Sequence, residues 1–343
     1  MRALICREPG KLMLEDRPEP ARGPDEALIQ IRRVGICGTD FHIFQGEHPY
    51  LEYPRVMGHE LSAEVLESPA SSGLQSGQRV IVNPYLSCGT CYACQAGKPN
   101  CCMRIGVLGV HRDGGMCERL SLPVGNLYPA GDLTLDQAAS IEFLAIGAHG
   151  VRRAGVSPGM RTLVIGVGPI GLGAAIFASI AGGIVWMMDR DSDRLIAGAG
   201  LMRGAGAIIA DENAPEAVFA VTGGNGFDIV IDATGNRVSM ENAFRFVAHG
   251  GTYLLLGVIR DDITFSDAEF HKREMTLMAS RNALKADFDH VVVSIAAGKL
   301  PIAELITHRT TLDGAVTDLP RWATEKHGLI KALISLDEAL PIG

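Results

Sequence analysis

A buried strand that runs directly into a glycine turn and an apolar helix constrains the fold more than any other segment. The chain reads Thr162-Leu-Val-Ile-Gly166-Val-Gly168-Pro169-Ile170-Gly171, with an apolar stretch over residues 172–181. In this G-x-G-x-x-G pattern, Gly166 makes the tight turn, Gly168 lets the backbone approach a pyrophosphate, and Gly171 lets helix and strand pack closely. The helix N-terminus offers free N–H groups to phosphate. The segment therefore predicts a dinucleotide-binding site.

Apolar strands alternate with helical stretches on both sides of this motif. Strands are expected at residues 161–165, 183–188, 207–209, 228–231, 251–256 and 275–279. Such alternation is typical of one doubly wound parallel sheet. We predict an α/β protein in which residues 148–282 form this Rossmann domain.

The beginning of the chain has a different pattern, in which short predicted strands are separated by Gly, Pro and Asn. Strands are expected at residues 2–6, 26–34, 61–66, 79–82 and 119–122. Near the C-terminus, a helical run at 288–297 and a strand at 329–336 are expected to return to this part. Residues 1–147 and 283–343 are therefore predicted to form a second, β-rich domain.

An acidic residue stands at the end of the strand that follows the glycine motif. A carboxylate at Asp189 is suited to hydrogen bond the adenosine ribose hydroxyls and to repel a 2′-phosphate, which favours NAD over NADP. Arg190 directly after it offsets part of that repulsion. Arg194 is also predicted to bind the cofactor. The alternative is a structural strand-end aspartate.

Four cysteines lie close together in one short stretch with the spacing C-x2-C-x2-C-x7-C. They are Cys88, Cys91, Cys94 and Cys102. Four thiolates at such spacing, in a segment interrupted by glycine and proline, can enclose one metal ion in a tetrahedral sulfur site, as structural zinc is held. The alternative is a set of buried or disulfide-bonded cysteines. We expect reduced thiols and a cytoplasmic protein, because the chain opens without a signal-like segment.

Composition excludes several classes of partner. The chain has 343 residues and a formal net charge of −8, without a basic surplus for a nucleic-acid backbone. No apolar stretch is long enough to predict a membrane span. The cysteine cluster is therefore not expected to be a nucleic-acid-binding zinc ribbon.

A second group of metal-binding side chains occurs in two fragments of the β-rich part. The first is Gly35-Ile-Cys37-Gly-Thr39-Asp40-Phe-His42, and the second is Gly58-His59-Glu60. Together they supply thiolate, imidazole and carboxylate, a donor set suited to catalytic zinc with one open position.

At this point the sequence resembles the zinc-dependent medium-chain alcohol dehydrogenases over nearly its whole length. The resemblance rests on the two fragments above, the cysteine loop, the segment Ile141-Glu142-Phe-Leu-Ala and the glycine motif. Within the family the chain is most similar to the sorbitol and threonine dehydrogenase branch. The segments at residues 47–55, 106–115 and 280–283 further resemble bacterial hexonate 5-dehydrogenases that act on L-galactonate or L-gulonate.

The resemblance implies a fold and a set of site residues. The β-rich domain should be GroES-like, with Cys37 and His59 binding the catalytic zinc and Glu60 or Glu142 as the third ligand. Asp40 should orient the zinc-bound histidine. In the implied reaction, a substrate hydroxyl gives hydride to NAD while Thr39 passes the proton towards His42.

Substrate class and assembly follow from the same resemblance. Arg281 matches an arginine that related enzymes present to the substrate, and a guanidinium suits a carboxylate. His111 is a further candidate contact. The expected substrate is a sugar acid; a neutral polyol, L-threonine or a non-catalytic zinc- and NAD-binding regulator are the alternatives. A homodimer or homotetramer is expected.

Overall fold

The computed structural model describes residues 1–47 and 52–336, and it divides the chain into two compact units. Unit 1 comprises Met1–Glu142 and Ile302–Gly343, and unit 2 comprises Phe143–Pro301. Part of the hexonate-like segment at residues 47–55 lies outside the described residues. Throughout the described chain, each helix is too short or too polar to cross a bilayer.

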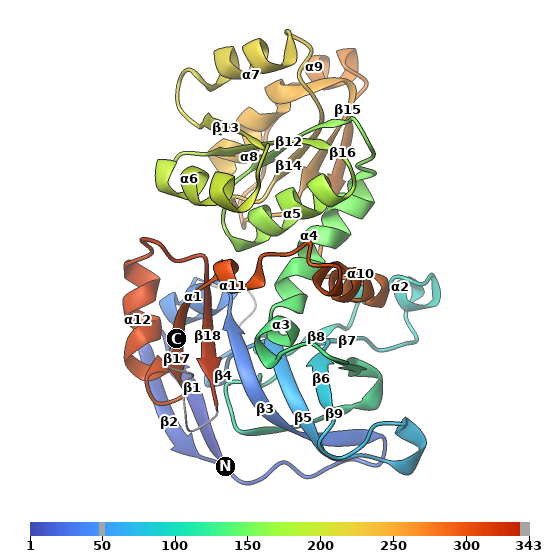
Figure 1. Cartoon of the computed structure of the whole chain (residues 1–343), viewed down its shortest axis with the longest axis vertical. Helices are drawn as coiled ribbons and strands as arrows, with labels where there is room; N and C mark the ends of the chain where they lie inside the picture. The colour runs from blue at the N-terminus through green and yellow to red at the C-terminus, as the bar shows by residue number, and fades with distance from the viewer. Residues whose placement is uncertain (48–51, 337–343) are drawn as a thin grey trace. The chain divides into compact units, whose positions relative to one another are not determined.

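Unit 1 is rich in β-strands, as the sequence predicts, and most of them pair antiparallel, while the last two strands pair in parallel (Figure 1). Its largest sheet has the order β10-β6-β5-β3-β18-β17, with β9 also paired to β3. These strands are β3 (Glu26–Ile36), β5 (Glu60–Glu67), β6 (Arg79–Val82), β9 (Arg119–Pro123), β10 (Leu127–Pro129), β17 (Ile306–Thr311) and β18 (Lys331–Ser335). The C-terminal strand β18 pairs antiparallel with β3, so the end of the chain returns to the first unit as predicted.

Smaller elements complete unit 1. A second sheet has the order β2-β1-β4, and β7 pairs with β8. The strands are β1 (Arg2–Glu8), β2 (Lys11–Asp16), β4 (Arg55–Val56), β7 (Tyr85–Leu86) and β8 (Gly106–Val107). The helices are α1 (Gly38–Gln45), α2 (Tyr92–Gln95), α3 (Leu135–Ala139), α11 (Ile302–Leu305) and α12 (Ala315–Thr324), with short 3-10 turns Ala70–Ser72, Pro99–Cys101 and Val124–Asn126.

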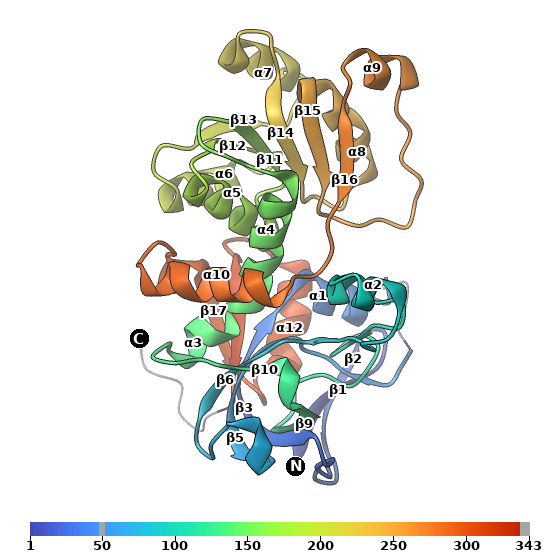
Figure 2. The same cartoon turned by 90° about the vertical axis from the view of Figure 1, so that its right-hand side faces the viewer.

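Unit 2 contains one parallel sheet with the strand order β13-β12-β11-β14-β15-β16 (Figure 2). The strands are β11 (Arg161–Ile165), β12 (Ile184–Asp189), β13 (Gly206–Ile209), β14 (Phe227–Asp232), β15 (Val247–Leu255) and β16 (Thr276–Ala279). This order reverses between β12 and β14, on either side of β11, which is the doubly wound arrangement predicted from the sequence. The switch point lies at the carboxyl end of β11, where the glycine motif begins.

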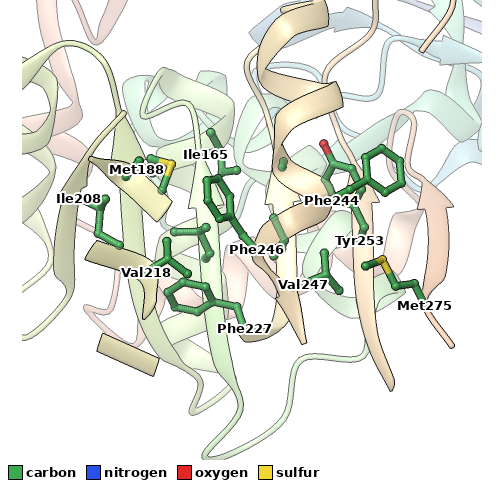
Figure 3. Packing of buried hydrophobic residues seen from close by; sticks show 14 residues of the cluster. Ile165, Met188, Ile208, Val218, Phe227, Phe244, Phe246, Val247, Tyr253 and Met275 are labelled. Carbon is green, nitrogen blue, oxygen red and sulfur yellow. The ribbon is translucent and has the colours of Figure 1, made fainter. Parts of the chain in front are cut away.

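Helices connect the strands of unit 2. They are α4 (Ile141–Ala154), which begins at the unit boundary, α5 (Pro169–Ile180), α6 (Ser192–Leu201), α7 (Ala214–Thr222), α8 (Arg237–Asn242), α9 (Asp267–Lys272) and α10 (Lys285–Ala296), with a 3-10 turn Ala243–Phe246. An apolar cluster packs between the sheet and its connections, and it includes Phe227, Phe246 and Tyr253 (Figure 3). Burial of these rings stabilises the sheet that carries the glycine motif.

The unit boundaries differ from those predicted. We expected residues 143–147 and 283–301 in the β-rich part, but their contacts group them with unit 2. The reason is visible at α10, where Asp287 accepts hydrogen bonds from Arg152 Nε at 2.7 Å and lies 2.8 Å from His149 Nδ1. Both partners belong to α4, so hydrogen bonds to the buried carboxylate of Asp287 join α10 to α4 in unit 2.

Candidate active site and metal centres

The sulfur atoms of the four-cysteine cluster lie close enough to share one ion. The Sγ atoms of Cys88, Cys91, Cys94 and Cys102 all lie within 4.8 Å of one another. Cys91 Sγ is 3.5 Å from Cys94 Sγ and 3.9 Å from Cys102 Sγ, far longer than a disulfide bond. A tetrahedral zinc with bonds of about 2.3 Å places its sulfurs about 3.8 Å apart, so the spacing fits zinc.

Hydrogen bonds from the backbone support negative charge at this cluster. The N–H groups of Cys88 and Arg104 donate to Cys102 Sγ at 3.2 and 3.3 Å. Backbone N–H groups of Thr90 and Cys91 lower the pKa of Cys88 to about 5, whereas burial raises the pKa of Cys94 to about 11. Cys88 and Cys94 therefore differ in their readiness to ionise, and a bound cation would favour the thiolate form of Cys94.

The second donor set brings together two fragments that are separate in sequence. Ligand atoms of Cys37, His59 and Glu60 lie within 4.8 Å of one another. His59 and Glu60 are buried, and Cys37 is partly buried. His59 Nδ1 has no hydrogen-bond partner in the described part of the chain. A thiolate, an imidazole and a carboxylate beside an unsatisfied buried nitrogen fit a catalytic zinc.

Asp40 joins the two fragments through the backbone. Its carboxylate accepts a hydrogen bond from Cys37 N at 2.8 Å and another from Gly58 N at 3.2 Å. Asp40 stands at the start of α1, whose N-cap is Cys37, so the first bond also caps the helix. The resemblance implied that Asp40 orients the histidine ring. In the structure, Asp40 binds the backbone of both segments that carry the candidate ligands, while His59 Nδ1 has no hydrogen-bond partner among the described residues. That Asp40 orients the histidine ring stays a prediction.

Glycine makes room for Glu60. Gly35 of β3 is paired with Glu60 of β5, and a Cβ at Gly35 would lie 2.1 Å from Glu60 Oε2. The carboxylate therefore occupies the space above β3 and reaches Lys331 at the start of β18. Lys331 Nζ donates to Glu60 Oε1 and Oε2 at 2.7 and 2.8 Å, and also to Ile36 O at 3.1 Å.

The other candidate carboxylate, Glu142, has a different partner. It lies in the first turn of α4, and the hydroxyl of Tyr85 donates a hydrogen bond to its Oε1. Its Oε2 is buried and without a hydrogen-bond partner in the described residues. Burial raises the pKa of Glu142 to about 7, and the nearby charge of Glu60 contributes in the same direction.

Tyr85 and Lys331 were missed in the sequence. Lys331 interrupts the apolar run of residues 329–336, and a lysine at such a position signals a buried partner. Tyr85 carries no comparable signal, because it is one aromatic residue in a short apolar strand.

The proposed proton-transfer residues lie on α1. Thr39 Oγ1 is 3.7 Å from Cys37 Sγ, so this hydroxyl is next to a predicted zinc ligand. His42 is exposed, and its Nδ1 lies 3.0 Å from Glu47 Oε2. The helix thus carries one group beside the donor set and one in contact with solvent.

In unit 2 the glycine motif has the predicted conformation. Gly166 has φ of +88°, and a Cβ at Gly171 would lie 1.8 Å from Gly166 O. Gly168 is the N-cap of α5, Pro169 begins the helix, and Ile170 is the next residue of its first turn. A Cβ placed at Gly168 would meet no heavy atom within 4 Å from the described residues beyond its own chain neighbours, so the backbone there is open to a ligand.

Asp189 lies beside this turn. Its Oδ2 accepts a hydrogen bond from Val167 N at 2.7 Å, and its Oδ1 accepts one from Asp191 N at 3.0 Å. The aspartate therefore holds the glycine turn as well as ending β12. Arg190 is exposed, and Arg194 Nε lies 3.7 Å from Asp191 Oδ2.

The two candidate substrate residues belong to different units. His111 is in unit 1, where its Nδ1 accepts a hydrogen bond from Val107 N at 3.2 Å, and Arg281 is in unit 2 just after β16. Both residues are exposed.

Comparisons with known proteins identify the family of the chain. The family described as alcohol dehydrogenase GroES-like domain matches residues 23–132, and the family described as zinc-binding dehydrogenase matches residues 169–297. The chain is 42% identical to L-galactonate-5-dehydrogenase of Escherichia coli K12 over 98% of this chain and 99% of that protein.

Solved structures show the same architecture. A dehydrogenase from E. coli CFT073 complexed with NADH has a TM-score of 0.90 at 27% identity, covering 98% of this chain and 99% of that one. Alcohol dehydrogenase TADH from Thermus sp. ATN1 has a TM-score of 0.91 at 28% identity, covering 98% and 100%. The chain belongs to the zinc-binding alcohol dehydrogenase family: it is an oxidoreductase with a GroES-like unit and a Rossmann unit.

Proposed function

We propose that this dehydrogenase oxidises a secondary alcohol of a sugar acid of the L-galactonate or L-gulonate kind with NAD as hydride acceptor. The observation that carries the proposal is the buried donor set of Cys37, His59 and a glutamate in unit 1. The similarity to an L-galactonate-5-dehydrogenase along almost the whole chain supports the substrate class.

Each donor set is assigned one zinc ion. Cys88, Cys91, Cys94 and Cys102 hold a structural ion, because all four positions are filled by sulfur. Cys37 and His59 hold a catalytic ion together with Glu60 or Glu142. When bound, zinc supplies a Lewis acid that favours the ionised form of an alcohol, and NAD supplies the hydride acceptor.

Two residues of α1 transfer the proton of the substrate hydroxyl to solvent. Thr39 accepts the proton of the substrate hydroxyl, since its own hydroxyl lies beside Cys37. His42 passes the proton to solvent, because its ring is exposed and paired with Glu47.

The cofactor-binding groups are those of the glycine turn. Backbone N–H groups at the start of α5 bind the pyrophosphate, and Asp189 binds the adenosine ribose. The carboxylate of Asp189 favours NAD, since it would lie next to the extra phosphate of NADP. Arg190 and Arg194 provide positive charge near the same ribose, so both cofactors are compared in the test below.

Arg281 is proposed to bind the carboxylate of the sugar acid, with His111 as a further polar contact. A planar guanidinium pairs with a carboxylate through two parallel hydrogen bonds. We also propose a cytoplasmic homodimer or homotetramer. Strand β16 ends the sheet order among the described strands, and such an edge offers unpaired backbone groups to a second subunit.

A substrate panel tests the proposal. Initial rates of NADH formation are measured for aldonic acids, neutral polyols, L-threonine and simple alcohols, with NAD and NADP compared on the best substrate. Activity confined to aldonates, lost preferentially in Arg281→Met, is the expected result. Oxidation of polyols or threonine instead would replace the substrate class, and absence of turnover on every compound would contradict the dehydrogenase assignment.

A further inference from the structure

Two buried glutamates are candidates for the same ligand position at the catalytic donor set, and they have different hydrogen-bond partners. Glu60 is 0% and Glu142 is 2% exposed, so neither carboxylate is hydrated by bulk water. A buried carboxylate requires hydrogen bonds or a cation to offset its lost hydration. Which of them is left for a metal ion is therefore decided by the side chains that already contact each one.

Glu60 already has a cation. Both of its carboxylate oxygens accept hydrogen bonds from Lys331 Nζ, which is itself 1% exposed and also donates to Ile36 O. A divalent ion bound to Glu60 would share this carboxylate with an ammonium group a short distance away, and the two positive charges would repel each other.

Glu142 has a neutral partner and one free oxygen. The Tyr85 hydroxyl donates to Oε1, and Oε2 is buried with no partner in residues 1–47 and 52–336. Tyr85 is 6% exposed and belongs to the short strand β7, which is paired with β8. Its ring therefore has little freedom, and its hydroxyl fixes the orientation of the carboxylate.

Interatomic distance and hydrogen bonding favour different glutamates. Glu60 is grouped with Cys37 and His59 within 4.8 Å, and Glu142 is outside that group. The hydrogen bonds carry more weight, because they show which carboxylate oxygen is without a partner among the described residues. Freeing Glu60, in contrast, would weaken a buried ion pair, and breaking such a pair is strongly destabilising.

We infer that Tyr85 is a positioning residue that presents Glu142 as the carboxylate ligand in the substrate-free enzyme, and that Lys331 retains Glu60 as its own counter-ion. This inference rests on the proposed catalytic zinc site. Tyr85 would act by hydrogen bonding to a metal ligand and holding it in place. Loss of such a hydrogen-bond partner typically weakens metal binding by about 10–100-fold.

Metal binding without substrate tests this inference separately from the activity. Cobalt replaces the catalytic ion while the four-cysteine site keeps its zinc, which metal analysis verifies. Affinity is measured by chelator competition, and the ligand field is followed by the visible absorption of cobalt. The variants are Tyr85→Phe, Glu142→Gln and the double variant Glu60→Gln with Lys331→Met, which removes both charges of the ion pair together. Tyr128→Phe is the matched control, since that hydroxyl accepts from Asn83 at 2.9 Å elsewhere in unit 1.

The inference predicts a distinct order of effects. Tyr85→Phe should weaken cobalt binding by at least about tenfold and shift its absorption. Glu142→Gln should do so more strongly, while the double variant and Tyr128→Phe should stay within about threefold of the parent protein. The inference is overturned if the double variant loses as much affinity as Glu142→Gln or more, or if Tyr85→Phe behaves like Tyr128→Phe. A dehydrogenase that binds its catalytic metal through Glu60 would still oxidise substrates in the panel, but its double variant would lose cobalt affinity.

Discussion

Lys331 Nζ lies 2.7 Å from Glu60 Oε1, and both side chains are almost completely buried. Glu60 belongs to the donor set that it forms with Cys37 and His59. The two residues are brought together because β18, near the end of the chain, pairs with β3, which in turn pairs with β5. The pair links the last described strand of the chain to the residue after the predicted zinc-binding histidine.

Removing one member of this pair should destabilise unit 1. Lys331→Met leaves the Glu60 carboxylate buried without its ammonium, and such a change costs about 3–5 kcal/mol. The double variant with Glu60→Gln should recover most of that loss. Urea unfolding of the zinc-loaded proteins measures both. Equal stability of the single variant and the parent protein would show that the pair contributes nothing.

A methyl group at the third motif glycine should prevent cofactor binding. In Gly171→Ala the new Cβ would lie 1.8 Å from Gly166 O, so the turn and α5 must separate. Gly173→Ala is the control on the same helix, because its Cβ would meet its nearest neighbour at 3.5 Å. We expect NADH affinity, measured by fluorescence titration, to fall more than about tenfold in the first variant, a loss of about 1.4 kcal/mol. The second variant should bind normally. Similar affinities in both would contradict the role of the close packing.

Adjacent cysteines should differ in their effect on metal content. Cys102 belongs to the four-sulfur cluster and is buried, whereas Cys101 is exposed and outside it. Cys102→Ser should therefore lower the zinc content by one ion per chain and destabilise unit 1, while Cys101→Ser should change neither. Metal analysis after exhaustive dialysis distinguishes them. Full zinc occupancy in the Cys102 variant would contradict the assignment of a structural zinc ion to this loop.

Acid should weaken unit 2 through Asp287. Burial alone raises the pKa of this carboxyl, but hydrogen bonds from His149 and Arg152 lower it from 3.8 to about 2. Because the folded pKa is the lower one, the carboxylate stabilises the fold above about pH 4, and this contribution is lost as pH falls towards 2. The shift corresponds to about 2 kcal/mol.

The variant Asp287→Asn tests this pH dependence. It should be less stable than the parent protein by about 2 kcal/mol at pH 7, and the difference should shrink between pH 4 and about pH 2. Asp289→Asn, on the same helix, is the control, since its exposed ion pair with Lys285 is worth less than about 1 kcal/mol. A stability difference that is constant from pH 7 to pH 2 would rule out the titration of Asp287 as its cause.

The sequence predicted the elements whose signals are local. The strand before Gly166 and the helix after it follow from apolar runs on either side of a glycine turn, and the cysteine cluster follows from its spacing. The boundary near residue 283 was misplaced, because the contact of Asp287 with His149 joins residues far apart in the chain.

The same physical reason explains what was missed in the site. Glu60 and Glu142 were both identified as candidate ligands, yet their partners Lys331 and Tyr85 come from strands that no local pattern connects to them. Asp40 was predicted to act beside the candidate ligands, but its bonds to the backbone of Cys37 and Gly58 depend on how α1 meets the chain before β5.

Turnover of a Cys37 variant tests the central claim, a zinc-dependent hydride transfer at Cys37 and His59. Initial rates of NADH formation are compared for the parent protein, Cys37→Ser and Cys6→Ser, with the best substrate of the panel. Cys6 is buried in the same unit but outside both metal clusters, so its variant controls for loss of a buried thiol. Zinc contributes several kcal/mol to such a reaction, and about 4 kcal/mol corresponds to a thousandfold in rate. The account predicts a loss of about that size for Cys37→Ser and little change for Cys6→Ser; a Cys37→Ser enzyme that keeps a rate within about tenfold of the parent would contradict it.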